Sequence, residues 1–257
     1  MIKLIEKIKS KNRQEQFMPG LFSLIFNPYF FNRRAIYKGI KSHAQKLNGD
    51  LMDFGCGTKP YKDLFNVTSY IGIDLAENEG HNLPTEHIDV VYDGSKIPFQ
   101  NDMFDSIYSS EVFEHVFNLE EILLDINRVH KTGGLILLTM PFVWQEHEMP
   151  NDFGRYTSAG IKSILKKCNY EIVDHIKAPG YFLSVIQLLV AYVHHVVLPK
   201  SDSIKFVLAP LFIFPINLFA LTFNFFLPKS FDLFINHTIL AKNIKTSANR
   251  VDGSAPN

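Results

Sequence analysis

The residues best suited to chemistry begin with a glycine turn and the acids around it. An apolar run that ends in Gly55-Cys56-Gly57 is typical of a buried strand whose backbone turns tightly against a bulky group. Asp53 lies just before the turn, and Asp74 ends a second apolar strand about 20 residues further on. In a doubly wound fold, that offset places an acid on ribose hydroxyls. The spacing therefore predicts a nucleoside site.

The same stretch indicates which nucleoside is bound. A dinucleotide site needs a third glycine so that a helix N-terminus can approach a pyrophosphate, whereas Pro60 follows the turn here. Asp53 would repel a pyrophosphate but suits the cationic amino group of a methionine moiety. We therefore expect S-adenosylmethionine as the cofactor. A hydride-transferring dehydrogenase is the weaker alternative, because a second substrate domain is also absent from the sequence.

A second group of reactive side chains is Glu111-Val-Phe-Glu114-His115. It follows an apolar strand, and we expect it to open a helix at the carboxyl edge of the sheet, where open α/β folds bind their ligands. Methyl transfer is an in-line displacement, so the protein must position the acceptor and accept its proton with a base, or hold a metal that acidifies the acceptor hydroxyl.

Three blocks of this sequence resemble the class I S-adenosylmethionine-dependent methyltransferases. They are residues 51–58, 71–74 and 97–108, and the resemblance covers residues 47–179 and a last strand near 234–242. It implies an α/β fold with a doubly wound, Rossmann-like, mostly parallel sheet of seven strands whose last strand is antiparallel.

The resemblance also implies roles for residues at the strand ends. An acid after the third strand meets the adenine amino group and a neighbouring amide meets a ring nitrogen, which carries over to Asp93 and Gly94. The alternative for Asp93 is an acid that only caps a turn. The implied cofactor-binding set is Asp53, Gly55, Cys56, Gly57, Asp74, Leu75, Asp93, Gly94 and Glu111.

The second group resembles the Glu-X-X-Glu-His pattern of ubiquinone-biosynthesis O-methyltransferases and small-RNA 2′-O-methyltransferases. There these side chains bind magnesium, which would make Glu111, Glu114 and His115 ligands, with His147 as a possible fourth. In other relatives the first acid lines the cofactor pocket and the histidine shapes the site or acts as a base. We favour that second reading, with His115, Glu114 and His147 as the catalytic residues and no resident metal.

The elements that must position these residues follow from hydrophobic periodicity. The predicted strands include 70–75, 88–93, 135–140, 170–176 and 234–242. The predicted helices are 32–48 capped by Asn32, a short one from Lys59 with Pro60 in its first turn, 121–130 ended by Gly133-Gly134, and 157–169 capped by Thr157.

Residues 181–198 and 206–227 carry no acidic or basic residue except His194 and His195, and each run approaches the ~20 residues that span a bilayer. A helix that is apolar all round must be buried in protein or in lipid. We expect a membrane-associated insertion, and an apolar cap or dimer interface is the alternative. Because the last strand returns to the domain, two crossings or an interfacial hairpin are possible and one crossing is not.

The predicted domain organisation has five parts. They are a basic and aromatic membrane-proximal segment at 1–31, the cofactor domain at 32–180, the apolar insertion at 181–230, the final strand at 231–243 and a disordered tail at 244–257. Residues 1–9 have the pattern of a basic amphipathic helix, as found at anionic membrane surfaces, although a solvated helix fits equally.

Composition excludes several classes of protein. The formal net charge is zero, which argues against a nucleic-acid partner, and two cysteines are too few for a disulfide framework. We expect a cytoplasmic methyltransferase at the inner membrane face, acting on a small-molecule, lipid or lipid-linked sugar acceptor. The alternative is a non-catalytic membrane protein with a degenerate cofactor domain.

Overall fold

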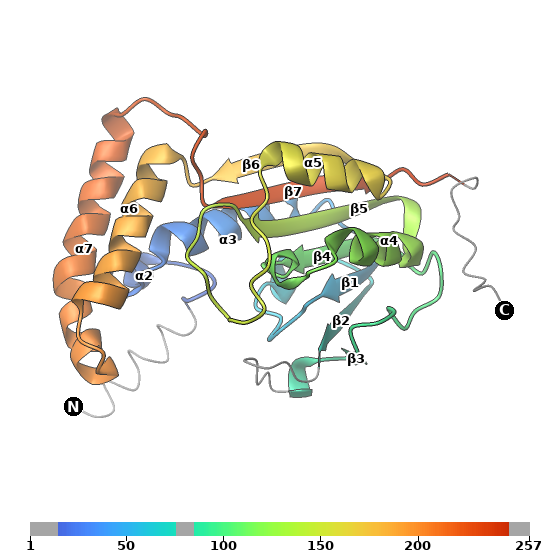
Figure 1. Cartoon of the computed structure of the whole chain (residues 1–257), viewed down its shortest axis with the longest axis horizontal. Coiled ribbons are helices and arrows are strands. Elements are labelled where there is room, and N and C mark those ends of the chain that lie inside the picture. The colour runs from blue at the N-terminus through green and yellow to red at the C-terminus, as the bar shows by residue number, and fades with distance from the viewer. Residues whose placement is uncertain (1–14, 76–84, 247–257) are drawn as a thin grey trace. The chain divides into compact units, whose positions relative to one another are not determined.

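The computed structural model describes residues 15–75 and 85–246 of the chain (Figure 1). Within them the chain forms two compact units. The first takes the residues up to 41 together with 142–144 and 177–237, and the second takes 42–141, 145–176 and the residues from 238 on. These limits differ from the predicted domain limits, because the chain enters the first unit three separate times.

The centre of the second unit is a sheet of seven strands in the order β3-β2-β1-β4-β5-β7-β6. The strands are β1 (Asp50–Phe54), β2 (Ser69–Leu75), β3 (Val90–Tyr92), β4 (Phe104–Ser110), β5 (His130–Pro141), β6 (Tyr170–Ala178) and β7 (Asn236–Asn243). β1 pairs in parallel with β2 and β4, and the last strand is antiparallel. The predicted fold class is therefore confirmed.

The strand order places a topological switch point at the centre of the sheet. From β1 the chain moves outward through β2 to β3, and it then returns to the other side of β1 as β4. Both neighbouring strands run parallel to β1, so their carboxyl ends meet at one edge. Ligands of open α/β sheets bind at such a point.

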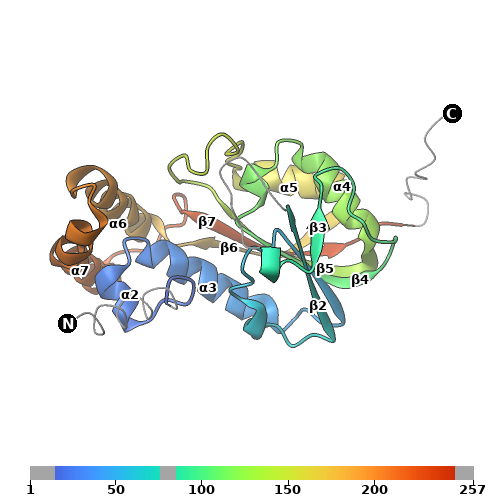
Figure 2. The ribbon, with the colours of Figure 1, turned by 90° about the horizontal axis from the view of Figure 1, so that it is seen from below.

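Helices α4 (Leu119–Val129) and α5 (Ser158–Lys167) lie side by side on one face of the sheet (Figure 2). Their buried residues Leu123, Ile126 and Leu165 join the strand residues Ile107 and Ile136 in one core. Thr157 is the N-cap of α5, as predicted, and its side chain accepts a hydrogen bond from the Gly160 amide.

Three predictions near the sheet edge were wrong in detail. Glu111 does not begin a helix: the chain forms only a 3₁₀ turn at η3 (Phe113–His115) before α4. Gly133 and Gly134 lie inside β5 and do not end α4, which stops at Val129. The short helix after the glycine turn is the 3₁₀ turn η1 (Lys62–Leu64), so Pro60 precedes it.

Helix α3 (Phe30–Ala44) also differs from its prediction. It begins two residues before Asn32, so Asn32 cannot be its N-cap. The Asn32 amide instead donates to the side chain of Gln187, because both residues are buried in the first unit and need internal partners.

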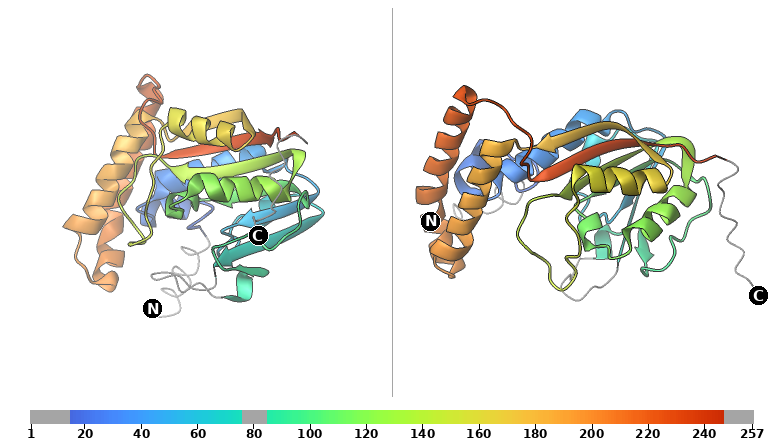
Figure 3. Two further views of the ribbon diagram at one scale, coloured as in Figure 1. Left: turned by 45° about the vertical axis from the view of Figure 1, so that its right-hand side comes forward. Right: turned by 45° about the horizontal axis from the view of Figure 1, so that its top comes forward.

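The first unit is built from α2 (Leu21–Phe26), the start of α3, and the long helices α6 (Tyr181–Tyr192) and α7 (Asp202–Phe226). A π-helical turn, η4 (Val193–Val197), extends α6. Figure 3 shows α6 and α7 side by side from two directions. α7 runs unbroken through Pro210 and Pro215, and it starts four residues earlier than the second apolar run.

Some predictions concern residues outside the described part of the chain. These include the amphipathic helix at 1–9, and in the connection after β2 only the 3₁₀ turn η2 (Thr85–His87) is described. The predicted tail is described as far as residue 246, and there it is ordered. Lys245 is buried, and its ammonium lies 2.7 Å from Asp102 Oδ1.

Candidate active site

The glycine turn that follows β1 packs against the loop that follows β4. Gly55 has a φ of +73°, and its amide donates to Ile73 O at 2.9 Å. A Cβ atom at Gly55 would lie 2.3 Å from Val112 Cγ2, in the loop after β4. Both the left-handed backbone and the contact with Val112 therefore require glycine here.

Two other predicted cofactor residues border open space. Gly57 has a φ of +49°, and a Cβ atom there would meet nothing within 4 Å. At Gly94 a Cβ atom would meet only Leu75 Cδ2, at 3.8 Å. Backbone at both positions can thus be approached closely by a ligand, which is what a bound nucleoside needs. These residues fit the predicted cofactor.

Asp74 lies one residue before the end of β2 and faces the glycine turn. Its Oδ2 accepts from the Gly57 amide at 2.7 Å, and its Oδ1 accepts from the Leu75 amide at 2.8 Å. A carboxylate oxygen can accept more than one hydrogen bond, so these two bonds are compatible with a contact to ribose hydroxyls. Asp74 therefore also shapes the turn, a structural role that the sequence did not indicate.

Asp53 is buried beneath the turn. The Tyr70 hydroxyl donates to its Oδ2 at 2.5 Å. The pKa of Asp53 is raised to about 7, mainly by burial and less by the nearby Asp74 and Asp89, although the Tyr70 hydrogen bond and Lys59 act in the opposite direction. A cationic amino group at this carboxyl would favour its ionised form. The environment thus suits the predicted contact with the methionine moiety.

The other predicted cofactor residues are less directly placed. Asp93 Oδ1 accepts from the amide and the hydroxyl of Ser95, so it does cap a turn. The Cys56 side chain is buried beside Gly72, and burial raises the pKa of its thiol to about 12. Only the backbone of Cys56 can face a cofactor, because its sulfur is directed into the protein.

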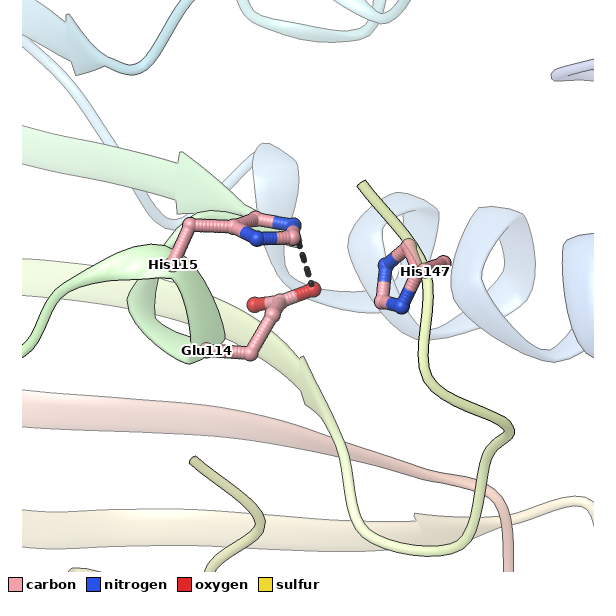
Figure 4. A group of neighbouring side chains, drawn as sticks. All are labelled: Glu114, His115 and His147. Atoms are coloured by element: carbon pink, nitrogen blue, oxygen red, sulfur yellow. Dashed lines mark ion pairs between the residues drawn. The ribbon is translucent and has the colours of Figure 1, made fainter. Parts of the chain in front are cut away.

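The second part of the site is η3, after β4. Glu111 has a φ of +56°, and its Oε1 accepts from the Thr139 hydroxyl at 2.9 Å. Glu114 and His115 follow on η3, and His147 comes from the loop after β5 (Figure 4). One ligand-capable atom from each of Glu114, His115 and His147 lies within 4.8 Å of the others. The structure thus groups His147, and not Glu111, with the Glu-His pair.

His115 has a defined orientation. Its Nδ1 lies 2.8 Å from the backbone carbonyl of Asn151, and a carbonyl can only accept, so Nδ1 carries the proton. In the neutral ring Nε2 then holds the lone pair. It lies 3.4 Å from Glu148 Oε2 and 3.7 Å from Glu114 Oε1. The His115 side chain is 18% exposed, so an acceptor can reach it.

Glu114 is fully buried. Neither carboxylate oxygen has a hydrogen-bond partner among the described residues. Burial raises the pKa of Glu114 well above its usual range, and the neighbouring Glu111 raises it further. A buried carboxylate without hydrogen bonds is costly, so this environment favours the protonated form of Glu114.

The loop that carries His147 is held by its own side chains. Asp152 accepts two hydrogen bonds from the Arg155 guanidinium, at 2.5 and 2.7 Å, and one from the His147 amide. Burial would raise the pKa of Asp152, but these bonds lower it to about 2. The amides of Phe153 and Gly154 also donate to Glu114 O, which ties the loop to η3.

Sequence reasoning missed several partners of the site. Tyr70 on Asp53, Val112 against Gly55 and the Asn151 carbonyl on His115 come from three different elements. Asn151 and Glu148 lie in a loop with no periodicity. Tyr70 opens a predicted strand, but only the register of β1 against β2 places it diagonally across from Asp53.

Known proteins are similar to this chain in sequence and in fold. A family model described as a methyltransferase domain matches residues 31–176. An uncharacterized protein of Methanocaldococcus jannaschii is 27% identical over 118 residues, which is 44% of this chain, and the chain spans 56% of that protein's length. Its description assigns no activity.

Two solved structures share the fold. A proposed methyltransferase from Bacillus halodurans has a TM-score of 0.50 and 13% identity, over 82% of this chain and 99% of that one. Phosphoethanolamine N-methyltransferase 2 of Haemonchus contortus, in complex with S-adenosylmethionine, has a TM-score of 0.51 and 16% identity, over 91% and 59% of the two chains.

The sheet has its topological switch point at β1, and Asp53 and Asp74 lie next to a glycine turn with left-handed backbone. This arrangement defines a Rossmann-like domain of the S-adenosylmethionine-dependent methyltransferase class. Because the family model matches more than half of the chain, the chain belongs to this methyltransferase domain family. S-adenosylmethionine is accordingly its cofactor.

Replacing Asp74 tests the cofactor site. We expect Asp74→Ala to weaken S-adenosylmethionine binding by at least a hundredfold, since two charge-assisted hydrogen bonds are worth about 3 kcal/mol or more. Calorimetric titration of the purified full chain measures this. Lys166→Ala, on the exposed surface of α5, is the control. Wild-type affinity in Asp74→Ala would refute the assignment.

The pKa of Asp53 predicts a pH-dependent affinity. The carboxyl of the free protein is neutral below about pH 7, and a cofactor ammonium favours its ionised form, so affinity should rise with pH. The slope below pH 7 has a limit of about tenfold per unit. Titrations between about pH 5.5 and 7.5, where an α-amino group remains largely protonated, measure it. Asp53→Asn should bind weakly and without this slope; a wild-type affinity that is flat over this range would contradict the prediction.

Proposed function

We propose that this chain transfers a methyl group from S-adenosylmethionine to a hydroxyl of a small-molecule, lipid or lipid-linked sugar acceptor at the cytoplasmic face of a membrane. The observation that carries the proposal is the orientation of His115, whose Nδ1 is committed to the Asn151 carbonyl. Its basic nitrogen, Nε2, is thereby available to an acceptor next to the cofactor turn.

The cofactor supplies an electrophilic methyl group on a sulfonium centre. The residues of this chain hold it through Asp74, Asp53 and the open backbone at Gly57. His115 Nε2 takes the proton of the acceptor hydroxyl while the oxygen bonds to the methyl carbon and the carbon–sulfur bond breaks. The products are the methyl ether, S-adenosylhomocysteine and protonated His115.

The surrounding acids suit this role. Glu148 Oε2 lies 3.4 Å from His115 Nε2 and would stabilise the imidazolium that forms. Burial raises the pKa of Glu114 well above its usual range, which favours the neutral form of this acid beside the histidine. His147 stands 5.0 Å from His115, ring to ring, and helps to define the acceptor side of the site.

A metal-assisted version of the same reaction has its own support. The unpaired oxygens of Glu114, together with His115 and His147, are donors that a divalent cation accepts. A bound Mg²⁺ would lower the pKa of the acceptor hydroxyl. Glu111 is directed toward Thr139, so its place in the predicted magnesium set receives no support from this geometry.

The proposed membrane location is supported by the apolar surface of α7 in the first unit. Among the described helices, residues Ser203–Phe226 of α7 alone are long and apolar enough to cross a bilayer, and only 22% of its most apolar window is buried. Val207 and Leu211 are each 68% exposed. An apolar surface of this kind marks a contact with lipid or with protein.

The alternative is a non-catalytic membrane protein with a degenerate cofactor domain. The hydrogen bonds of Asp74 and the open backbone at Gly57 argue for an intact site. A wild-type chain that binds no S-adenosylmethionine in the micromolar range would support the degenerate reading.

Replacing His115 tests the chemistry. We expect His115→Ala to lower turnover by 10²- to 10⁴-fold, the usual contribution of a general base, with cofactor affinity nearly unchanged. Initial rates with an identified acceptor and a parallel calorimetric titration measure the two effects. His87→Ala is the matched control, because this histidine is exposed on η2.

Chelation separates the two versions of the mechanism. Full activity in excess chelator would eliminate the metal and leave His115 as the base. Loss of activity that Mg²⁺ restores would establish the metal. A fully active His115→Ala enzyme would eliminate both roles, and the proposal with them.

Charges on the apolar face test the membrane location. Val207→Glu combined with Leu211→Glu should move most of the protein from the membrane fraction to the soluble fraction, because carboxylates resist burial in lipid. Both side chains are exposed, so the fold should tolerate the change. Val173→Glu, at a 56% exposed position of β6, is the matched control. Equal sedimentation of both variants would contradict the prediction.

A further inference from the structure

The chain between β6 and β7 restricts how α6 and α7 can meet a bilayer. β6 and β7 are neighbours in one sheet, and α6, η4 and α7 connect them. The chain must therefore cross a membrane an even number of times between these strands, or not at all.

The lengths of the two helices decide between these cases. α7 has 25 residues, about 37 Å, which exceeds the ~30 Å hydrocarbon core. α6 and its extension η4 together form an apolar helix of 17 residues, Tyr181–Val197, about 25 Å long, which is shorter than that core and contains His194 and His195. Only α7 qualifies as a span among the described helices. A single crossing of the membrane between β6 and β7 is excluded by the topology. Because the described helices include no second helix of sufficient length, the lengths favour an arrangement in which neither α6 nor α7 crosses.

The inner sides of both helices lead to the same conclusion. Near the middle of α6, Gln187 accepts from the Phe31 amide and donates to Pro28 O, in the irregular segment between α2 and α3. Near the middle of α7, Asn217 donates to Leu24 O. The amide of Arg33 bonds to Tyr29 O, one helical turn away. If the helices crossed the bilayer, the irregular segment between α2 and α3 and the nearby Arg33 would lie at mid-bilayer depth, which is costly.

The outer sides are apolar and exposed. On α6, side chains at helical spacing form one stripe that is 45% to 64% exposed: Tyr181, Val185, Leu189, Tyr192 and Val196. On α7 the buried stripe is Ala209, Ile213, Asn217 and Ala220, and the opposite side exposes Phe212, Leu218, Phe219, Phe223 and Phe226. Each helix thus has one protein-facing side and one side with no partner among the described residues.

The charge of the first unit indicates the kind of surface that it meets. Its described residues contain eight Lys and Arg against three Asp and Glu, a surplus of five, although the whole chain has 26 of each kind. A basic unit with exposed aromatic and aliphatic side chains is typical of proteins that lie on anionic lipid.

We propose that α6 and α7 lie along one leaflet of an anionic bilayer, with their outer apolar sides in the lipid, and that neither helix crosses it. This inference rests on the membrane association proposed above. The protein is then monotopic, so the α6–α7 connection stays on the same side of the membrane as the catalytic sheet.

Cysteine labelling tests the topology in the full chain. Cys56 and Cys168 are buried, so wild type should react little with a membrane-impermeant maleimide and serves as the background. Ser203→Cys places a thiol at the exposed start of α7, and Ser163→Cys places one on the exposed face of α5. Each variant is treated in sealed inside-out and right-side-out vesicles, and detergent-opened vesicles give the full signal.

We expect Ser203→Cys to be labelled only in the vesicle orientation that labels Ser163→Cys. Labelling of the two thiols in opposite orientations would show that the chain crosses the membrane and would overturn the inference, while the membrane association would stand. A chain absent from the vesicles, and found as an oligomer in solution, would overturn the membrane association itself and identify a second copy as the occupant of the apolar face.

Discussion

The packing of Gly55 against Val112 is the contact on which the site depends. It joins the end of β1 to the loop after β4, and a side chain at Gly55 would force the two apart. The first element turns around the cofactor, and the second leads into η3 with Glu114 and His115. The separation between the glycine turn and the pair Glu114 and His115 therefore depends on how closely two neighbouring strand ends approach at the switch point.

The site combines two buried acids whose pKa values are raised by burial, Asp53 and Glu114. Each is placed where a cation would restore its charge: the amino group of the cofactor at Asp53, and a metal ion at Glu114 if one binds. A free protein with neutral acids avoids the cost of uncompensated buried charges, and ligand binding supplies the compensation. Asp152 shows the opposite case, because Arg155 keeps it ionised and fixes the loop beside the site.

The apolar helices are governed by a different constraint. Their ends are attached to adjacent strands, so the sheet limits what the helices can do in a membrane. Polar side chains in the middle of each helix bond to the backbone of α2, α3 and the segment between them: Gln187 accepts from the Phe31 amide and donates to Pro28 O, and Asn217 donates to Leu24 O. These bonds give each helix an inner side and an outer side, a difference that the nearly uniform apolar sequence conceals.

Sequence alone determined the sheet and the glycine turn, because strand patterns and turn residues are local signals. It also assigned roles to Asp53, Asp74 and His115, and those roles stay predictions. It failed where neighbouring residues do not decide the outcome: α3 begins before Asn32, and Gly133-Gly134 continue a strand that pairs with β4. Only the tertiary structure decided the tautomer of His115, the pairing of Tyr70 with Asp53, and the grouping of His147 with Glu114. The physical reason is that these contacts depend on strand register and on loop conformation, which are fixed by residues far away along the chain.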